Sequence, residues 1–195
     1  MTDIKLQCHC GAVQGIARDC TASNGNRVVC CCDDCQAFAD HLQCQQDILD
    51  EFGGTEIYQT SQSQVEISSG KDQLRSLRLR RKGLLRWYTS CCDTPVGNTI
   101  NAGMPFIGII HNFMAIENRQ DRDTQLGPVK AVVQTKHARG IPNYPKHSAK
   151  FPLTITLRII GQMLMWKIRG KNKPSAFFTD DGFPIVKPII VNEQG

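Results

Sequence analysis

All ten cysteines of this 195-residue chain lie within its first 92 residues. Eight of them stand in three tight groups, which read Cys8-His9-Cys10-Gly11, Cys30-Cys31-Cys32-Asp33-Asp34-Cys35 and Cys91-Cys92. The N-terminal sequence has no long apolar run, so we expect no signal peptide and predict a cytoplasmic chain whose thiols stay reduced. Reduced thiols grouped in this way indicate metal binding or catalysis rather than a disulfide framework.

The first and last groups are typical of a structural zinc site. Zinc takes four ligands in a tetrahedron and accepts thiolates readily. Two ligands that are close in sequence, joined by two from a distant segment, can hold separate turns together. We therefore predict one zinc ion bound by Cys8, Cys10, Cys91 and Cys92.

The middle group predicts a second site of a different kind, formed by Cys30, Cys32 and Cys35. Three thiolates from one C-x-C-x-x-C loop can hold a metal and leave the fourth position for water or substrate. An open position is the mark of a catalytic zinc site, so these three cysteines are our candidate catalytic residues. Cys31 is expected to face away, because alternate residues of an extended chain face opposite ways. Cys20 and Cys44 have no partner at ligand spacing and are expected to be ordinary buried side chains.

Short segments with turn residues between them predict strands in the first half. These segments are Ile4–Gln7, Ala12–Ala17, Arg27–Cys30, Glu56–Thr60 and Gln64–Ile67, with a hairpin over 74–88 and a later strand at Pro105–His111. Strands without intervening helices argue against a parallel α/β sheet, so we predict a mainly β fold. One helix is expected to begin at Asp33 or Asp34, either of which can cap it, and to end before Gly53.

The second half is more basic than the first. Residues 104–195 carry thirteen Lys and Arg against six Asp and Glu, whereas residues 1–103 carry ten against twelve. The segment from Glu117 to Gly127 is expected to be a charged loop. After Pro152, a helix is predicted with an apolar face of Leu153, Leu157, Ile160, Leu164 and Ile168. We expect this face to pack against the protein; the alternative, a helix lying on a membrane, is suggested by Trp166 and the basic residues after it.

The order and spacing of the cysteine motifs resemble the glutathione-dependent formaldehyde-activating enzyme family, which includes centromere-protein-V type domains. That family shows C-x-C-G, then C-x-C-x-x-C, then G-x-D-x-L, and then R-x-F-C-x-x-C-G-T. The corresponding segments here are Cys8–Gly11, Cys30–Cys35, Gly70–Leu74 and Arg86–Pro95. The resemblance covers residues 4–112 and suggests a bacterial branch of the family. We accordingly divide the chain into a zinc-binding domain over 1–112 and a basic extension over 113–195 that packs on it.

The resemblance implies an Mss-four-like fold of several small curved antiparallel sheets, with one helix after the C-x-C-x-x-C loop and a C-terminal helical extension. It also implies a structural zinc on the first and last cysteine pairs and a second zinc on the middle group. The family's last C-x-x-C falls on Thr89 and Cys92 here. Cys91 is expected to replace the missing cysteine, with three thiolates plus water as the alternative. The glycine that follows in the family is Asp93 in this chain.

The leading hypothesis is a zinc-dependent carbon–sulfur lyase that holds two zinc ions and acts on a small, glutathione-like thiol adduct of an aldehyde. Candidates to support the ligands or to meet substrate carboxylates are Asp33, Asp34, His41, Arg78, Arg80, Arg86 and Lys130. The alternatives are a non-catalytic zinc-stabilised scaffold or protein-interaction module, and a thiol redox or metal sensor. The expected partner is a small thiol or thiol adduct, with a homodimer left open. We expect binding to neither nucleic acid nor a membrane.

Overall fold

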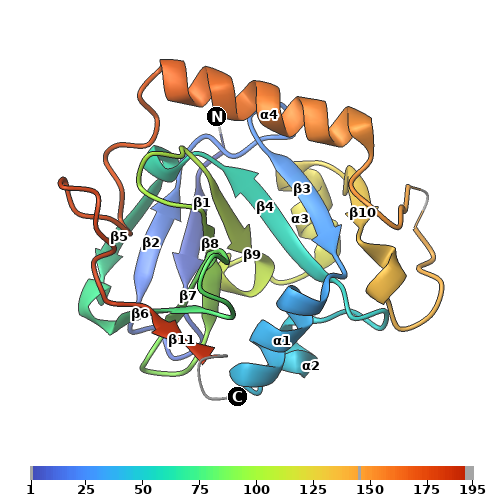
Figure 1. The fold of residues 1–195 in the computed structure, drawn as a ribbon, viewed down its shortest axis with the longest axis horizontal. Coiled ribbons are helices and arrows are strands. Elements are labelled where there is room, and N and C mark those ends of the chain that lie inside the picture. The colour runs from blue at the N-terminus through green and yellow to red at the C-terminus, as the bar shows by residue number, and fades with distance from the viewer. Residues whose placement is uncertain (1, 145, 192–195) are drawn as a thin grey trace.

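Two sheets form most of the computed structural model, which describes residues 2–144 and 146–191 (Figure 1). The strands within these residues are β1 Ile4–Gln7, β2 Gln14–Ala17, β3 Asn26–Cys30, β4 Thr55–Thr60, β5 Val65–Ser69, β6 Leu74–Arg78, β7 Leu85–Thr89, β8 Pro95–Thr99, β9 Ile107–Ile110, β10 Ala131–Val133 and β11 Ile189–Ile190. The smaller sheet has the order β1-β2-β5, and the larger has the order β10-β3-β4-β9-β8-β7-β6-β11. The predicted mainly β fold is confirmed. A three-stranded sheet and an eight-stranded sheet take the place of several small antiparallel ones, and β10 and β11 pair in parallel with their neighbours.

The helices depart from the sequence prediction at two places. In the described residues they are α1 Asp33–His41, α2 Gln45–Ile48, α3 Arg119–Leu126 and α4 Leu153–Ile168, with 3-10 turns at Gln62–Gln64, Lys71–Gln73, His111–Phe113 and Thr135–His137. The single helix expected after Asp33 is interrupted, because Gln43 adopts a φ of 55° between α1 and α2. The segment expected to be a charged loop contains α3. Asn118 caps that helix by accepting a hydrogen bond from the amide of Asp121 at 3.0 Å.

The main core lies between the two sheets. Ile4 and Leu6 of β1 and Val65 of β5 meet the side chains of the larger sheet. Trp87 of β7 is completely buried there, and its ring lies 5.1 Å from that of Phe177. The alternation of apolar side chains along the strands explains this packing, because every second residue faces the same side.

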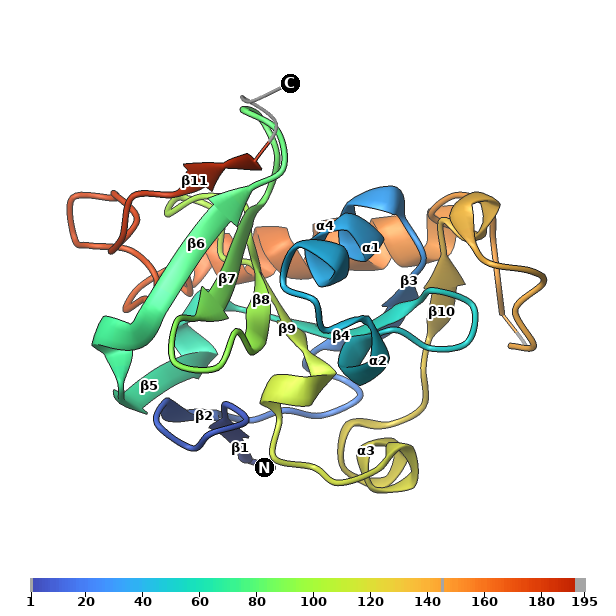
Figure 2. The same cartoon turned by 90° about the horizontal axis from the view of Figure 1, so that it is seen from below.

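A second core lies on the other face of the larger sheet, under α1. Phe38 and Ala39 of α1 pack there against Val28 of β3 and Ile57 of β4. Figure 2 shows α1 and the smaller sheet on opposite sides of the larger sheet. This second core also contains Cys30, so the C-x-C-x-x-C loop lies where β3 passes into α1.

Residues after 112 contribute strands to the same large sheet as the residues before them. β10 pairs in parallel with β3, and β11 pairs in parallel with β6. These two strands form the opposite ends of the sheet (Figure 1). The proposed extension is thus joined to the first part by backbone hydrogen bonds as well as side-chain contacts; its last residues, 192–195, lie outside the described residues.

Helix α4 is oriented the opposite way from our expectation. Its polar stripe faces the protein: Arg158 donates to Asn26 Oδ1 at 2.7 Å, and Asn26 donates to Gln162 Oε1 at 2.6 Å. The five apolar residues predicted to pack are all exposed. That prediction is wrong because the polar stripe finds its hydrogen-bond partners in the protein, at Asn26 of β3 and at backbone carbonyls of residues 22–23. Among the described residues, no helix combines the length and apolar composition needed to cross a bilayer.

Candidate metal centres

The first and last cysteine groups converge on one cluster, called here the four-cysteine cluster. The thiols of Cys8, Cys10, Cys91 and Cys92 lie within 4.8 Å of one another. The Sγ–Sγ distances are 3.6 Å from Cys8 to Cys10, 3.8 Å from Cys8 to Cys91 and 3.7 Å from Cys91 to Cys92. Cys8 is buried whereas Cys10 and Cys91 are exposed, so the cluster lies at the surface. Four thiols this close form a soft donor set that could bind a metal ion.

The turn after β1 presents the first two sulfurs. The amide of Gly11 donates to the carbonyl of Cys8 at 2.9 Å. Gly11 has a φ of +79°, and a Cβ atom there would lie 3.0 Å from the Gln7 side-chain amide. The amide of Val13 donates to Cys8 Sγ at 3.2 Å, a contact that favours the thiolate over the thiol. The glycine of the C-x-C-G motif is therefore required by the turn itself.

The late pair shows how the chain accommodates Thr89 in place of a cysteine. The hydroxyls of Thr89 and Thr94 lie 3.4 Å and 3.1 Å from Cys92 Sγ. Burial alone would raise the pKa of Cys92, but hydrogen bonds from Thr89 and Thr94 lower it to about 5. Asp93 has a φ of 50°, the left-handed conformation that suits the glycine of the related motif. Cys91 thus supplies the fourth sulfur of the cluster, and the Thr89 side chain forms a hydrogen bond with Cys92.

The middle group forms a second cluster, called here the three-cysteine cluster. Cys30 ends β3, Cys32 immediately precedes α1 and Cys35 lies in the first turn of α1. Their thiols lie within 4.8 Å of one another. Cys31 instead packs with Val29 in a separate apolar group. The spacing brings these sulfurs together because the strand alternation excludes Cys31 and the first helical turn returns Cys35.

The three sulfurs of the three-cysteine cluster could serve as donors to a cation. Hydrogen bonds from Cys30 and Cys35, together with the positive charge of the buried Arg86, lower the pKa of Cys32 to about 2. Hydrogen bonds with Cys32 and Cys35, together with burial, raise the pKa of Cys30. The cluster without metal therefore favours one thiolate flanked by two thiols. A bound cation would replace the two remaining protons and balance three thiolates.

Four of the seven predicted polar candidates lie at the start of α1 beside this cluster: Asp33, Asp34, Arg80 and Arg86. Asp34 accepts a hydrogen bond from Arg80 at 2.8 Å and lies 3.9 Å from the guanidinium of Arg86. Asp33 pairs with His137 at 2.7 Å. The expectation that one of these aspartates caps α1 is wrong: the N-cap is Cys32, and its side chain makes no capping hydrogen bond. Both aspartates are instead engaged by basic side chains.

The remaining candidates are occupied elsewhere. Arg78 donates to the carbonyl of Gly83 in its own hairpin at 2.5 Å. Lys130 donates to the carbonyl of Gly25 at 2.6 Å and so holds the loop before β3. His41 is exposed in the last turn of α1, at the end opposite the three-cysteine cluster. Cys20 and Cys44 are buried outside both clusters, as predicted.

A cavity of about 560 Å³ adjoins the four-cysteine cluster. Cys92 and Asp93 form part of one wall, and Leu42, Gln43 and Cys44 from the connection between α1 and α2 also line it. The segment that carries Cys92 and the segment that follows α1 bound the cavity together with Gln7, His9 and Asn112. Its volume is in the range of pockets that bind small molecules.

A protein family matches nearly the whole chain. Residues 1–188 match a family of unknown function, DUF6151. The chain belongs to the DUF6151 family. Both cysteine clusters and α4 lie inside the matched residues. No curated protein matches the chain.

Among solved structures, this DUF6151 chain is similar to a structural-genomics protein from Rhodobacter sphaeroides. The two are 17% identical, with a TM-score of 0.44. The similarity covers 64% of this chain and 96% of the other.

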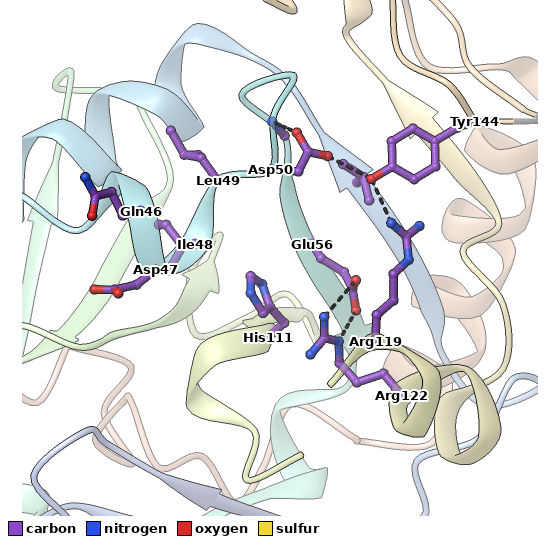
Figure 3. Close-up of a pocket in the computed structure, with 12 residues that line it drawn as sticks. Gln46, Asp47, Ile48, Leu49, Asp50, Glu56, His111, Arg119, Arg122 and Tyr144 are labelled. Atoms are coloured by element: carbon purple, nitrogen blue, oxygen red, sulfur yellow. Dashed lines mark hydrogen bonds and ion pairs between the residues drawn. The ribbon is translucent and has the colours of Figure 1, made fainter. Parts of the chain in front are cut away.

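The structure of this DUF6151 member also shows a polar pocket that the sequence analysis missed (Figure 3). The pocket has a volume of about 260 Å³ and lies near β4, α3 and the segment after α2. Glu56 accepts a hydrogen bond from Arg122 at 2.7 Å and a second from the buried Arg27 at 2.7 Å. On the other wall, Tyr144 donates to Asp50 at 2.9 Å and accepts from Arg119 at 2.9 Å. These residues come from distant segments, so no local motif marks them.

His111 is a titratable residue that lines the same pocket as Glu56 and Arg122. Burial and the charge of Arg122 lower the pKa of His111, although Glu56 opposes that shift. Its Nδ1 atom is buried without a hydrogen-bond partner in the described structure. The imidazole is therefore neutral in the folded protein at neutral pH.

Acidification is expected to destabilise the protein partly through His111. Below the unfolded-state pKa of 6.5, the unfolded chain binds a proton that the folded chain resists, so stability falls as pH decreases. Melting temperatures of the wild type and His111→Asn, measured at about pH 7.5 and 5.5, test this linkage. Between these two pH values the wild type is expected to lose more stability than the variant. Equal losses in the two proteins would contradict a contribution from His111. Effects of acid on the cysteine clusters are common to both proteins and cancel in the comparison.

Proposed function

We propose that this protein is a zinc-dependent carbon–sulfur lyase that acts on a small thiol adduct of an aldehyde. The observation that carries the proposal is the convergence of Cys30, Cys32 and Cys35 beside the buried Arg86. Three sulfur donors provide one ligand fewer than a closed structural zinc site uses. The four thiols of the other cluster match such a closed site.

The residues of the two clusters would have different roles. Zinc held by Cys30, Cys32 and Cys35 would supply a Lewis acid that stabilises a leaving thiolate or polarises an adduct oxygen. Arg86 offsets part of the negative charge of the three thiolates, and Phe38 covers its guanidinium at 5.4 Å from the ring centroid. Asp34 holds Arg80 and Arg86 near the same helix start.

The proposed reaction is the cleavage of a hemithioacetal. The carbon–sulfur bond breaks and its electron pair remains on sulfur, while the hydroxyl proton leaves to water and the carbonyl double bond forms. The products are a thiolate and an aldehyde, so no oxidant or reductant is needed. A glutathione-like substrate carries carboxylates, for which the exposed Arg80 is the candidate partner.

Cys35→Ala is expected to lower the zinc content of the purified protein from about two ions per chain to about one, because each thiolate set holds one ion. Elemental analysis against protein concentration measures this directly. Cys44→Ala is the matched control, since Cys44 is also buried but lies outside both clusters. The control should retain about two ions. An unchanged content in Cys35→Ala would rule out that residue as a ligand.

The enzymatic part of the proposal needs a separate measurement. Exchange of labelled formaldehyde with its glutathione adduct can be followed by NMR with and without the zinc-loaded protein. The wild type should accelerate exchange, and Cys32→Ala should not. A zinc-loaded wild type without any acceleration would contradict the lyase and favour a zinc-stabilised scaffold. Reversible formation of a Cys32–Cys35 disulfide without acceleration would favour a redox sensor instead.

A further inference from the structure

The outer face of α4 is a continuous apolar surface that nothing in the described structure covers. Its residues and their exposed fractions are Leu153 72%, Leu157 60%, Ile160 55%, Leu164 59% and Ile168 78%. They recur at intervals of three and four residues, so they lie along one side of the helix. Single exposed apolar residues are ordinary, but an aligned row of five marks an interaction surface.

The inner side of the helix also carries apolar residues, beside its polar stripe. Trp166 is buried against the protein, and Ile155 packs against the core under α1. Arg158 is the sole charged residue from Phe151 to Trp166. A helix that is apolar on opposite sides is normally covered on both. The protein covers one side, so the other requires an external partner.

The charge around α4 identifies the kind of partner. Residues 124–179 contain ten Lys and Arg and no Asp or Glu. Five of these cations are exposed within the last turn of the helix or a few residues beyond its ends, at Lys150, Lys167, Arg169, Lys171 and Lys173. Of these, Lys173 also donates to the carbonyl of Asp180 at 2.8 Å. Two copies meeting through α4 would place like charges together, which is unfavourable. An anionic surface would be attracted to the same residues.

The position of α4 suits a flat partner. The helix runs along the upper edge of the molecule in Figure 1, and no other labelled element lies above it. In Figure 2, which is seen from below, α4 lies behind the other elements. A planar surface can therefore meet the length of the helix. Apolar residues on one side with flanking Lys and Arg are the composition of helices that lie in the lipid headgroup region.

We propose that α4 docks this protein on anionic lipid surfaces, with Leu153, Leu157, Ile160, Leu164 and Ile168 inserted among the lipids and the flanking basic residues bound to headgroups. The sequence-based expectation of no membrane binding depended on this face being packed. The inference is independent of the zinc chemistry, because it uses no residue of either cysteine cluster.

Co-sedimentation of the full-length protein with lipid vesicles tests the proposal. Phosphatidylcholine vesicles containing phosphatidylglycerol should bind the wild type, whereas phosphatidylcholine alone should bind it far less. Raising the NaCl concentration to about 0.5 M should weaken the binding, because salt screens the attraction of the basic residues. No binding to the anionic vesicles, or equal binding to both vesicle types, would overturn the proposal.

Leu157→Glu/Leu164→Glu should weaken vesicle binding by at least about 100-fold, since each buried leucine contributes roughly tenfold or more. Leu84→Glu/Phe183→Glu is the control: it makes the same charge change at two exposed apolar residues outside α4 and should bind more tightly than the α4 variant. Both α4 positions are exposed, so the fold should be retained, which circular dichroism can check. Lys167→Gln/Arg169→Gln provides a second variant and should reduce the salt dependence.

The oligomeric state distinguishes lipid from a second copy of the chain as the partner of α4. Light scattering should find the wild type monomeric without lipid. A dimer that Leu157→Glu/Leu164→Glu converts to a monomer would show that a second copy covers α4, and would overturn the lipid proposal. Equal vesicle binding by the wild type and Leu157→Glu/Leu164→Glu would also overturn the lipid proposal.

Discussion

Replacing Glu56 with glutamine is expected to lower the free energy of unfolding by about 3–5 kcal/mol. Glu56 is 8% exposed and accepts hydrogen bonds from both Arg27 and Arg122. Burial alone would raise the pKa of Glu56, but the two arginines hold it below its ordinary value. Removal of the carboxylate charge leaves two buried guanidinium groups without their shared anion, and each must then stay charged because arginine does not deprotonate in proteins.

Urea unfolding at neutral pH measures this effect. Glu66→Gln is the control, because Glu66 also pairs with an arginine, Arg18, but both side chains are more than half exposed. An exposed pair contributes about 0–1 kcal/mol, so the control should stay close to the wild type. A loss below about 1 kcal/mol in Glu56→Gln would mean that the pocket relaxes or admits water, against the expectation from its burial.

Cys10→Ala is expected to remove one zinc ion per chain and to lower the melting temperature strongly. Cys10 and Cys91 belong to turns that are distant in sequence, and the cluster joins the end of β1 to the turn after β7. Structural zinc sites contribute about 10–16 kcal/mol of apparent binding free energy in small domains, much of which is folding energy. A larger chain retains its core, so we expect partial destabilisation rather than complete unfolding.

Elemental analysis and calorimetry of the same samples test this prediction. Cys10→Ala should fall to about one zinc ion and melt well below the wild type, and a chelator should have little further effect on the first site. Cys35→Ala should lose the other ion with a smaller drop in melting temperature, because its ligands lie within one short loop. Equal losses of zinc and stability in both variants would contradict the assignment of a structural role to the four-cysteine cluster and a catalytic role to the three-cysteine cluster.

The cysteine clusters were predictable because their spacing directly encodes geometry. Cys30 and Cys32 are separated by one residue of extended chain, and Cys35 returns after the first helical turn, so all three sulfurs follow from local structure. Cys91 was predictable because it forms, with Cys92, a late pair that could join Cys8 and Cys10 from a distant segment. What the sequence left open was whether adjacent Cys91 and Cys92 can join one cluster, since this depends on the left-handed backbone at Asp93.

Neither the orientation of α4 nor the Glu56 pocket could be predicted from the sequence, and the reasons differ. Apolar periodicity identifies the face of a helix that is expected to be buried. It does not indicate whether that face is buried against the same chain or against a partner. Arg158 and Gln162 found hydrogen-bond partners in the protein, and the apolar face was left outside. The pocket joins Glu56, His111 and Arg122 from three distant segments. β10 is likewise three residues long and pairs with a strand about a hundred positions earlier, which no local pattern indicates.

The two short parallel strands at the ends of the large sheet have a consequence for biosynthesis. β10 and β11 cover the outer edges of β3 and β6, and both are made after all the other strands. Until they emerge, the nascent sheet presents two rows of unpaired backbone amide and carbonyl groups, which are templates for strand addition from other chains. Truncation before Ala131 should therefore yield a polypeptide that keeps its cysteines yet aggregates through its sheet edges. Late synthesis of β10 and β11 makes chaperone protection most necessary while these two strands have not yet been made.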